Sequence, residues 1–354
     1  MSTSAGPPGA GAGRTTLDEV AAHAGVSRAT VSRVVNRAST VDPLLVDRVT
    51  RAIDDLRYVP NQAARSLVLR RTDAVVLVAA ESESRFFGDP FFAALVRGVS
   101  RELAHGGLHL VLSMAQTPLD IDRLERFVRG GHVDGVLVIS EHADLDAIGR
   151  LATVRVPMVA GGRPMVTGTG TAFVDHDNVR GGALAAARLQ AIGRTRIGTI
   201  TGPQDMAAGV DRLAGFAAEL GAAYDPELTE EGDFTTPSGA DAVAALLARR
   251  PDLDGLFVAS DMMALGALGR LRSLARRVPE DVAVVGFDDA EVAAASTPPL
   301  TTVRQRTTDQ GRLMAQVLMR RLGRDVARPM PELDGDPDAD GIVLGVDLVV
   351  RETA

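Results

Sequence analysis

One short segment of the chain gathers side chains that could contact nucleic acid. Ser27 is a good helix cap, and the residues from Arg28 to Asn36 follow it with valines at helical spacing. At 100° per residue the valines share one face, and the opposite face carries Arg28, Ser32, Arg33 and Asn36. Arginine can bond guanine bidentately, while serine and asparagine contact bases or phosphates. An ordinary amphipathic helix with a solvated polar face would show the same pattern, so the flanking elements must decide.

These flanking elements are two further short helices. Thr16 and Glu19 are spaced as a capping box for a helix over Leu17–Ala24, and Gly25 ends that helix. A third helix begins at Asp42. Two short helices joined by a tight, glycine-containing turn are typical of a helix-turn-helix, whose second helix enters the DNA major groove.

The charge of the chain is distributed unevenly. The 354 residues carry a net charge of −8, and all 38 basic residues are arginine. From Arg14 to Arg71 there are ten arginines against six acidic residues, a net charge of +4, which leaves −12 for the rest. A basic head on an acidic body indicates that only the head meets a polyanion such as DNA.

Several functional classes are excluded by what the sequence lacks. There is no cysteine, so disulfides, thiolate metal sites and cysteine nucleophiles are ruled out. The longest apolar runs have about seven residues, far short of the roughly 20 that span a membrane. Residues 1–14 are rich in Ser, Gly, Ala and Pro, which predicts a disordered tail rather than a signal peptide and hence a cytoplasmic protein.

Enzyme signatures are also absent, so we expect no catalytic residues, no metal site and no cofactor. The motifs GxxxxGK[ST], HExxH and GxSxG do not occur. His176 lies between two aspartates, which we interpret as a solvated loop rather than a metal site. Asp288 and Asp289 could pass for an acid–base pair, but adjacent residues at a strand end point apart, so we interpret them as a turn.

Beyond Thr72, short apolar strands alternate with helical segments, which favours doubly wound parallel sheets. About 280 residues exceed one such sheet of ordinary size, so we expect two lobes with a cleft between them. The predicted strands are Ala74–Ala80, His109–Ala115, Val133–Ser140, Val156–Ala160, Arg196–Thr201, Gly255–Ser260 and Val282–Phe287. The predicted helices include Phe91–His105, Asn178–Ile192, Asp211–Gly221 and Ala240–Arg249.

Long motifs in both parts resemble the lactose-repressor/galactose-repressor family of transcriptional regulators. They are TLDEVAAHAGVSRATVSRVVN at 16–36, YVPN at 58–61 with ARSL at 64–67, VDHDN at 174–178, SDMMALG at 260–266 and VGFDD at 285–289. The resemblance covers nearly everything from Thr15 to Arg351. It implies a helix-turn-helix head, a hinge helix and a two-lobed body like a periplasmic binding protein.

The expected domains follow from this resemblance and from the element pattern. They are a disordered tail (1–14), a helix-turn-helix domain (15–60), a hinge (61–71) and an effector-binding and dimerisation domain (72–354). Within the last, we expect one lobe over about 72–171 and 303–331, and the other over about 172–302 and 332–354.

The resemblance also implies which residues contact DNA. Arg28, Ala29 and Arg33 match the base-reading positions, although Ala29 can offer only apolar contact, for example to a thymine methyl group. Leu67 matches the hinge residue that wedges into the minor groove. The full expected set is Thr16, Ser27, Arg28, Ala29, Thr30, Ser32, Arg33, Asn36, Asn61, Ala64 and Leu67.

Ligands in open α/β sheets bind beyond the carboxyl ends of the strands. Arg212 and Asp261 follow predicted strands there, and a guanidinium beside a carboxylate suits vicinal hydroxyl groups. Four of the ten phenylalanines fall within residues 86–92, where rings could stack on a sugar or a base. The resemblance implies an effector pocket with Phe91, Phe92, Arg163, Arg212, Phe234 and Asp261.

We therefore expect a repressor that binds a palindromic double-stranded operator as a homodimer and responds to a small molecule between its lobes. A sugar or sugar derivative is the first choice of effector, and a purine or nucleoside is the alternative. A solute-binding protein for transport and a nucleotide-dependent enzyme are the competing functions. The basic head disfavours the first, and the missing glycine-rich phosphate loop disfavours the second.

Overall fold

In the computed structural model, residues 15–35, 41–58, 71–166, 168–333 and 341–354 are described, and the chain divides into two units after Thr72. The described residues of the first unit form three helices, α1 (Leu17–Ala24), α2 (Arg28–Val35) and α3 (Pro43–Asp55). Every strand among the described residues lies in the second unit. No helix among these residues combines the length and apolar character that a membrane span requires.

Helix α1 begins and ends as its sequence predicts, and α2 and α3 begin at the predicted residues. The hydroxyl of Thr16 accepts a hydrogen bond from the backbone of Glu19, whose carboxylate accepts one from the backbone of Thr16, so the capping box is confirmed. Gly25 ends α1 in the left-handed conformation with φ 62°. A small apolar core of Val20, Ala21, Ala24, Val31, Val49, Ala52 and Tyr58 holds the helices together.

The second unit contains two sheets, as predicted, and the described residues give each of them six strands rather than the seven predicted in all. The first has the order β11-β5-β4-β3-β1-β2, and all its neighbouring strands are parallel. Its strands are β1 (Ala74–Ala79), β2 (His109–Met114), β3 (Gly135–Ile139), β4 (Met158–Gly161), β5 (Ala172–His176) and β11 (Gly341–Leu344).

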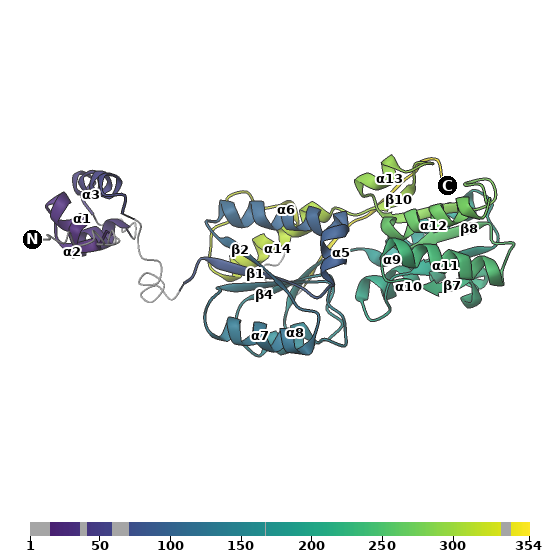
Figure 1. Ribbon diagram of the computed structural model, residues 1–354, viewed down its shortest axis with the longest axis horizontal. Coiled ribbons are helices and arrows are strands. Elements are labelled where there is room, and N and C mark those ends of the chain that lie inside the picture. The colour runs from purple at the N-terminus through teal and green to yellow at the C-terminus, as the bar shows by residue number, and fades with distance from the viewer. Residues whose placement is uncertain (1–14, 36–40, 59–70, 167, 334–340) are drawn as a thin grey trace, which may run out of the picture. The chain divides into compact units, whose positions relative to one another are not determined.

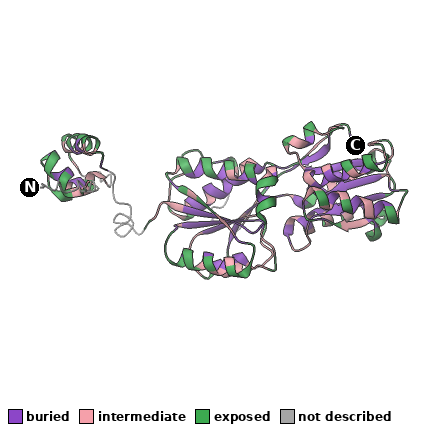
Figure 2. Ribbon diagram, in the orientation of Figure 1, coloured by how far each residue is buried: buried purple, intermediate pink, exposed green. Residues whose placement is uncertain are grey.

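The second sheet has the order β12-β10-β9-β8-β6-β7, and only the edge strand β12 runs antiparallel to its neighbour. Its strands are β6 (Ile197–Thr201), β7 (Thr229–Glu231), β8 (Gly255–Val258), β9 (Ala283–Asp288), β10 (Thr301–Arg304) and β12 (Asp347–Val349). The central strands of both sheets are buried, because helices cover both faces (Figure 2).

Helices pack on the two faces of each sheet. Figure 1 shows α6 (Pro90–His105) and α14 (Thr307–Arg321) on one side of the first sheet, with α7 (Pro118–Arg129) and α8 (Ala147–Ala152) on the other. Against the second sheet, α9 (Asn178–Ala191) packs with α10 (Ala207–Leu220), and α11 (Thr236–Arg249) packs with α12 (Asp261–Ser273). The short helices α5 (Glu83–Gly88) and α13 (Glu291–Ala295) follow β1 and β9.

The sheet topology corrects the predicted lobe boundaries. β5 pairs with β4 and β11 in the first sheet, so residues 172–176 and 341–344 belong to the first lobe and not to the second. β10 extends the second lobe to Arg304 rather than to residue 302. The chain thus crosses between the lobes after β5, after β10 and between β11 and β12. Buried parallel strands have similar apolar sequences, so composition alone does not reveal which sheet a strand joins.

Two glycines bring α9 and α10 into backbone contact. A Cβ atom on Gly182 would lie 2.0 Å from the carbonyl oxygen of Arg212, and one on Gly215 would lie 1.8 Å from the carbonyl oxygen of Val179. Only glycine permits this approach. It places Arg212 of α10 against the first turn of α9, where Asn178 lies.

We predict that Gly182→Ala lowers the free energy of unfolding by at least about 2 kcal/mol, because the added methyl group must push α10 away from α9. Gly269→Ala is the control, since a Cβ atom at this exposed position of α12 meets nothing within 4 Å. It should be neutral or stabilise by up to about 1 kcal/mol. Urea unfolding of both variants measures the difference, and equal effects would contradict the close packing of α9 and α10.

Candidate functional site

A cleft lies between the two lobes, at the carboxyl ends of the strands of both sheets. It encloses about 780 Å³, including the part that opens to solvent. Polar side chains from both lobes line it together with a few aromatic rings. They include Arg85, Asp89, Phe91, Arg163, Asp175 and Gln310 from the first lobe, and Asn178, Arg212, Phe234 and Asp288 from the second.

The guanidinium of Arg212 is the most heavily buried charge in the cleft. Its Nε donates to Oδ1 of Asn178 at 2.9 Å, and Nη1 donates to the carbonyl oxygen of Ala259 at 2.6 Å. The guanidinium lies over the ring of Phe287, with 3.6 Å between Cζ and the ring centroid. Nη1 is 3.9 Å from a carboxylate oxygen of Asp288. Fixed partners therefore aim this cation at one place in the cleft.

The junction of β5 and α9 supplies Asn178, which accepts the hydrogen bond of Arg212 and is itself held in place. Asn178 donates from Nδ2 to Asp175 at 3.0 Å and to the carbonyl oxygen of His176 at 3.1 Å. The other oxygen of Asp175 accepts the backbone N–H of Arg163 at 2.9 Å. Burial raises the pKa of the Asp175 carboxyl group. Because the chain crosses between the lobes at this junction, a ligand that contacts it contacts both lobes.

His176 is buried at the end of β5, so its predicted place in a solvated loop is wrong. Burial, with the nearby charge of Arg212, lowers the pKa of His176 to about 3. The imidazole is therefore neutral at physiological pH. The neutral His176 ring therefore lines the cleft without adding a charge to it.

Asp288 ends β9 on the opposite wall of the cleft. Its Oδ1 accepts a hydrogen bond from Nε2 of Gln305 at 2.6 Å, and its backbone has φ 121°, a region that non-glycine residues rarely adopt. Burial raises its pKa to about 7, although the positive charge of Arg212 opposes the rise. Asp289 points away and bonds Nε of Arg304 at 2.6 Å, so the expected divergence of the two aspartates holds.

Aromatic rings form the remaining walls. Phe91 at the start of α6 and Phe234 before α11 line the cleft from different lobes. The guanidinium of Arg85 lies 4.7 Å from the centroid of the Phe234 ring and so connects the lobes at this wall. Flat apolar faces beside hydrogen-bonding groups suit a ligand that has both kinds of surface.

Two predicted effector contacts do not line the cleft. Phe92 is fully buried behind Phe91, with the ring centroids 5.2 Å apart, and packs in the core of the first lobe. Asp261 is also fully buried: its carboxylate accepts the hydroxyl of Thr302 at 2.6 Å and the backbone N–H of Ala290 at 2.9 Å. It therefore holds the loop after β9, and Asp288 at the end of β9 provides the carboxylate at the cleft.

Ion pairs close the two lobes on each other. The guanidinium of Arg163 donates to both oxygens of Asp211 at 2.7 and 2.9 Å. Nδ1 of His142 lies 2.8 Å from the carboxylate of Asp205, whose backbone carbonyl accepts the N–H of Ala143. Hydrogen bonds, first with Glu81 and then with Asp205, raise the pKa of His142 to about 9. Arg163 thus lines the cleft and also fastens it.

The described part of the first unit exposes its predicted DNA-contacting face. Arg28, Ala29 and Arg33 on α2 are exposed, whereas Val31 on the opposite face is fully buried. Thr16 and Ser27 are exposed at the helix starts, and Thr30 and Ser32 are half-buried. The remaining predicted contacts lie outside the described residues; these are Asn36, Asn61, Ala64 and Leu67.

Sequence reasoning missed several cleft residues. Asp175 and Asn178 enter the sequence prediction only as part of the VDHDN motif, because β5 ends in polar residues and is not predicted as a strand. Asp288 is predicted to lie in a turn. Arg85 is not predicted to line the cleft, because the phenylalanines at 86–92 are the candidates chosen in that segment. The rule that ligands bind beyond strand ends would have found the first three once β5 and the end of β9 were placed.

We predict that His176→Asn changes how stability depends on pH. The unfolded chain binds a proton on His176 near pH 6.5, but the folded chain does so only near pH 3. Between these values the wild type loses stability as the pH falls, by at most about 1.4 kcal/mol per pH unit from this group, and the variant lacks that loss. Denaturant unfolding between about pH 4 and 7 measures the difference between the two proteins, which should be flat above pH 6.5. A constant difference throughout would show that His176 is not buried in its neutral form.

Comparisons with known proteins agree with this two-part architecture. Residues 16–61 match the model for bacterial regulatory proteins of the lacI family, and residues 186–353 match that for the periplasmic binding protein-like domain. The HTH-type transcriptional regulator CelR of Thermobifida fusca is 46% identical over 344 residues, which cover 96% of this chain and 98% of that protein. The ribose operon repressor of Escherichia coli K12 is 34% identical over 317 residues, 87% of this chain and 93% of that repressor.

Solved structures give the same result. A transcriptional regulator CelR–cellobiose complex matches with a TM-score of 0.74 and 45% identity over 96% of this chain and all of the other. The Lac repressor dimer bound to operator and the anti-inducer ONPF matches with a TM-score of 0.81 and 28% identity, covering 96% of this chain and 98% of the other. The chain therefore belongs to the lacI family of bacterial regulatory proteins, and it is a DNA-binding transcriptional regulator rather than an enzyme.

Proposed function

We propose that this regulator is a repressor whose interlobe cleft binds a glucose-containing disaccharide of the cellobiose type. The proposal rests on the groups that line the cleft. A buried guanidinium, carboxylates and amides from both lobes face the same space as two aromatic rings. The similarity to a regulator solved with cellobiose supports this ligand class.

The chemistry of the cleft suits a neutral sugar. A sugar ring carries vicinal hydroxyl groups that donate and accept, and Arg212 and Asp288 offer a donor and an acceptor 3.9 Å apart. The apolar face of a pyranose packs on aromatic rings such as Phe91 and Phe234.

A ligand in this cleft would couple to the arrangement of the lobes. It would contact Arg163 and Asp175 on one side and Arg212 on the other, so it would bind the closed cleft more tightly than an open one. That difference in affinity is what shifts a conformational equilibrium, typically by about 1–3 kcal/mol. The ion pairs of Arg163 with Asp211 and of His142 with Asp205 are contacts that opening would break.

We also propose that the chain acts as a homodimer on a palindromic operator in the cytoplasm. The edge strand β2 and helix α7 expose four large apolar side chains, Val111, Leu112, Leu119 and Phe127. An exposed apolar edge of this kind favours a covering partner. A second copy of the chain is the occupant we propose, consistent with the similarity to a repressor solved as a dimer on its operator.

The effector proposal predicts that cellobiose raises the melting temperature of the protein in a concentration-dependent way. Arg212→Lys should weaken cellobiose binding by about tenfold or more, because a lysine ammonium cannot reproduce the planar fork of donors. Asp241→Asn, which removes an exposed acid of α11 outside the cleft, is the matched control and should bind normally. Calorimetric titration measures the affinities. Binding of a purine in place of the disaccharide would assign the other effector class.

The DNA proposal predicts one preferred palindrome in a binding-site selection at physiological salt, with each half-site alone bound more weakly. Arg33→Ala should relax specificity at a single base pair of each half-site and cost about 1–3 kcal/mol there. Fluorescence anisotropy on the selected site and its variants reports this. A uniform loss of affinity on all sequences would indicate that Arg33 contacts only phosphate. No preference for any palindrome would refute the proposed dimer.

A further inference from the structure

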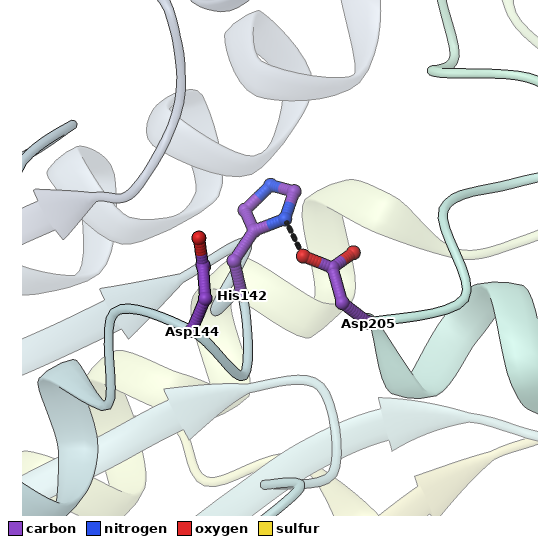
Figure 3. A group of neighbouring side chains, drawn as sticks. All are labelled: His142, Asp144 and Asp205. Carbon is purple, nitrogen blue, oxygen red and sulfur yellow. Dashed lines mark hydrogen bonds and ion pairs between the residues drawn. The ribbon is translucent and has the colours of Figure 1, made fainter.

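The loop after β3 and the loop after β6 bring three potential metal ligands together at the mouth of the cleft. One imidazole nitrogen of His142 and one carboxylate oxygen each of Asp144 and Asp205 all lie within 4.8 Å of one another. Figure 3 shows His142 and Asp144 on one loop, with Asp205 meeting Nδ1 of the imidazole from the other. The effector chemistry proposed above uses none of the three as a ligand contact.

The ion pair between His142 and Asp205 leaves Asp144 unexplained. The Asp144 carboxylate is exposed and forms no hydrogen bond or ion pair with any residue that the structure describes. It nevertheless lies within the group and adds a second negative charge there. The adjoining open hollow is lined by His142, Asp205, Glu231 and Asp233, so carboxylates outnumber cations around it. Such a hollow concentrates cations.

The second nitrogen of His142 has the partner that metal-binding histidines usually have. Nε2 lies 3.4 Å from Oε1 of Glu81, a carboxylate that is almost completely buried. Histidine ligands commonly donate their other ring N–H to a carboxylate, which fixes the tautomer and the direction of the ring. In this arrangement Nδ1 faces Asp205, and the Asp144 carboxylate lies on the other side of the imidazole ring (Figure 3). This observation is independent of the two aspartates.

We propose that His142, Asp144 and Asp205 bind one divalent transition-metal ion that bridges the two lobes at the mouth of the cleft. An imidazole with two carboxylates suits Zn²⁺ and similar ions, whereas Ca²⁺ and Mg²⁺ prefer sites made of oxygen alone. Tetrahedral ligands of zinc stand about 3.4 Å apart, given bonds of roughly 2.0–2.2 Å. The ligand atoms here are up to 4.8 Å apart, and the unpartnered Asp144 side chain is free to move to the shorter spacing. A water molecule from the hollow would complete the coordination.

The position of the site gives the ion a regulatory consequence. His142 and Asp144 belong to the first lobe and Asp205 to the second, so the bound ion would hold the cleft closed. This consequence rests on the proposed effector site, while metal binding itself does not. By linkage, an ion that favours the closed cleft tightens sugar binding, and sugar tightens metal binding by the same factor.

Calorimetric titration of the chelator-treated full chain with Zn²⁺ tests the site. It is run at about pH 8, because the metal must displace the imidazole proton. We expect one saturable site per chain that Asp144→Asn weakens by about tenfold or more, since even lost outer-shell partners cost that much. Asp144→Asn keeps the ion pair of His142 with Asp205. Glu231→Gln is the control: it removes the same charge from the hollow but no ligand, and should bind normally.

Several results would overturn the proposal. One is the absence of a saturable site. Another is equal Zn²⁺ affinity in Asp144→Asn and wild type, which would leave only an ion pair between His142 and Asp205. A third is an equal loss of affinity in Asp144→Asn and Glu231→Gln, which would indicate only a diffuse negative field. The bridging role is tested by cellobiose titration with and without Zn²⁺, where we expect the affinity to rise about five- to hundredfold. An unchanged affinity would refute bridging. If cellobiose does not bind at all, the effector proposal fails, and the Zn²⁺ titration still decides the metal site.

Discussion

The burial of the Arg212 guanidinium is the constraint on which the architecture of the cleft depends. A buried charge is costly unless hydrogen bonds and opposite charges surround it. Here the start of α9, the end of β8 and the end of β9 each supply a partner: Asn178, the carbonyl oxygen of Ala259 and Asp288. The close contact of α9 with α10 through glycine makes this convergence possible. The cleft is thus prepared for a polar ligand before any ligand arrives.

The contacts that join the lobes differ in kind from those that hold each lobe together. Each lobe has a dense apolar core, whereas the lobes meet through partly exposed ion pairs such as Arg163 with Asp211 and His142 with Asp205. Exposed ion pairs contribute little net stability, at most about 1 kcal/mol each. Opening the cleft therefore costs little compared with unfolding a lobe, and a ligand or ion that contacts both sides can decide the balance.

The helix-turn-helix could be predicted almost completely from the sequence, because its signals are local. The capping box at Thr16, the glycine stop at Gly25 and the valine face of α2 each depend on residues within one or two turns. The effector cleft was only partly predictable. Arg163, Arg212, Phe91 and Phe234 line it, but Asp261 and Phe92 point into the packed interior. Position after a strand is visible in a sequence, whereas the direction of the side chain depends on the helix packing.

The sequence alone determined which kinds of element form, that a basic helical head precedes an acidic body, and that the body is a two-lobed α/β structure. These properties follow from periodicity, capping and charge, which are written residue by residue. Only the tertiary structure decided which sheet β5 and β11 join, that Asp288 rather than Asp261 faces the cleft, and that His142 and Asp144 meet Asp205. Each of these depends on contacts between residues far apart in the chain, whose partners no local pattern specifies.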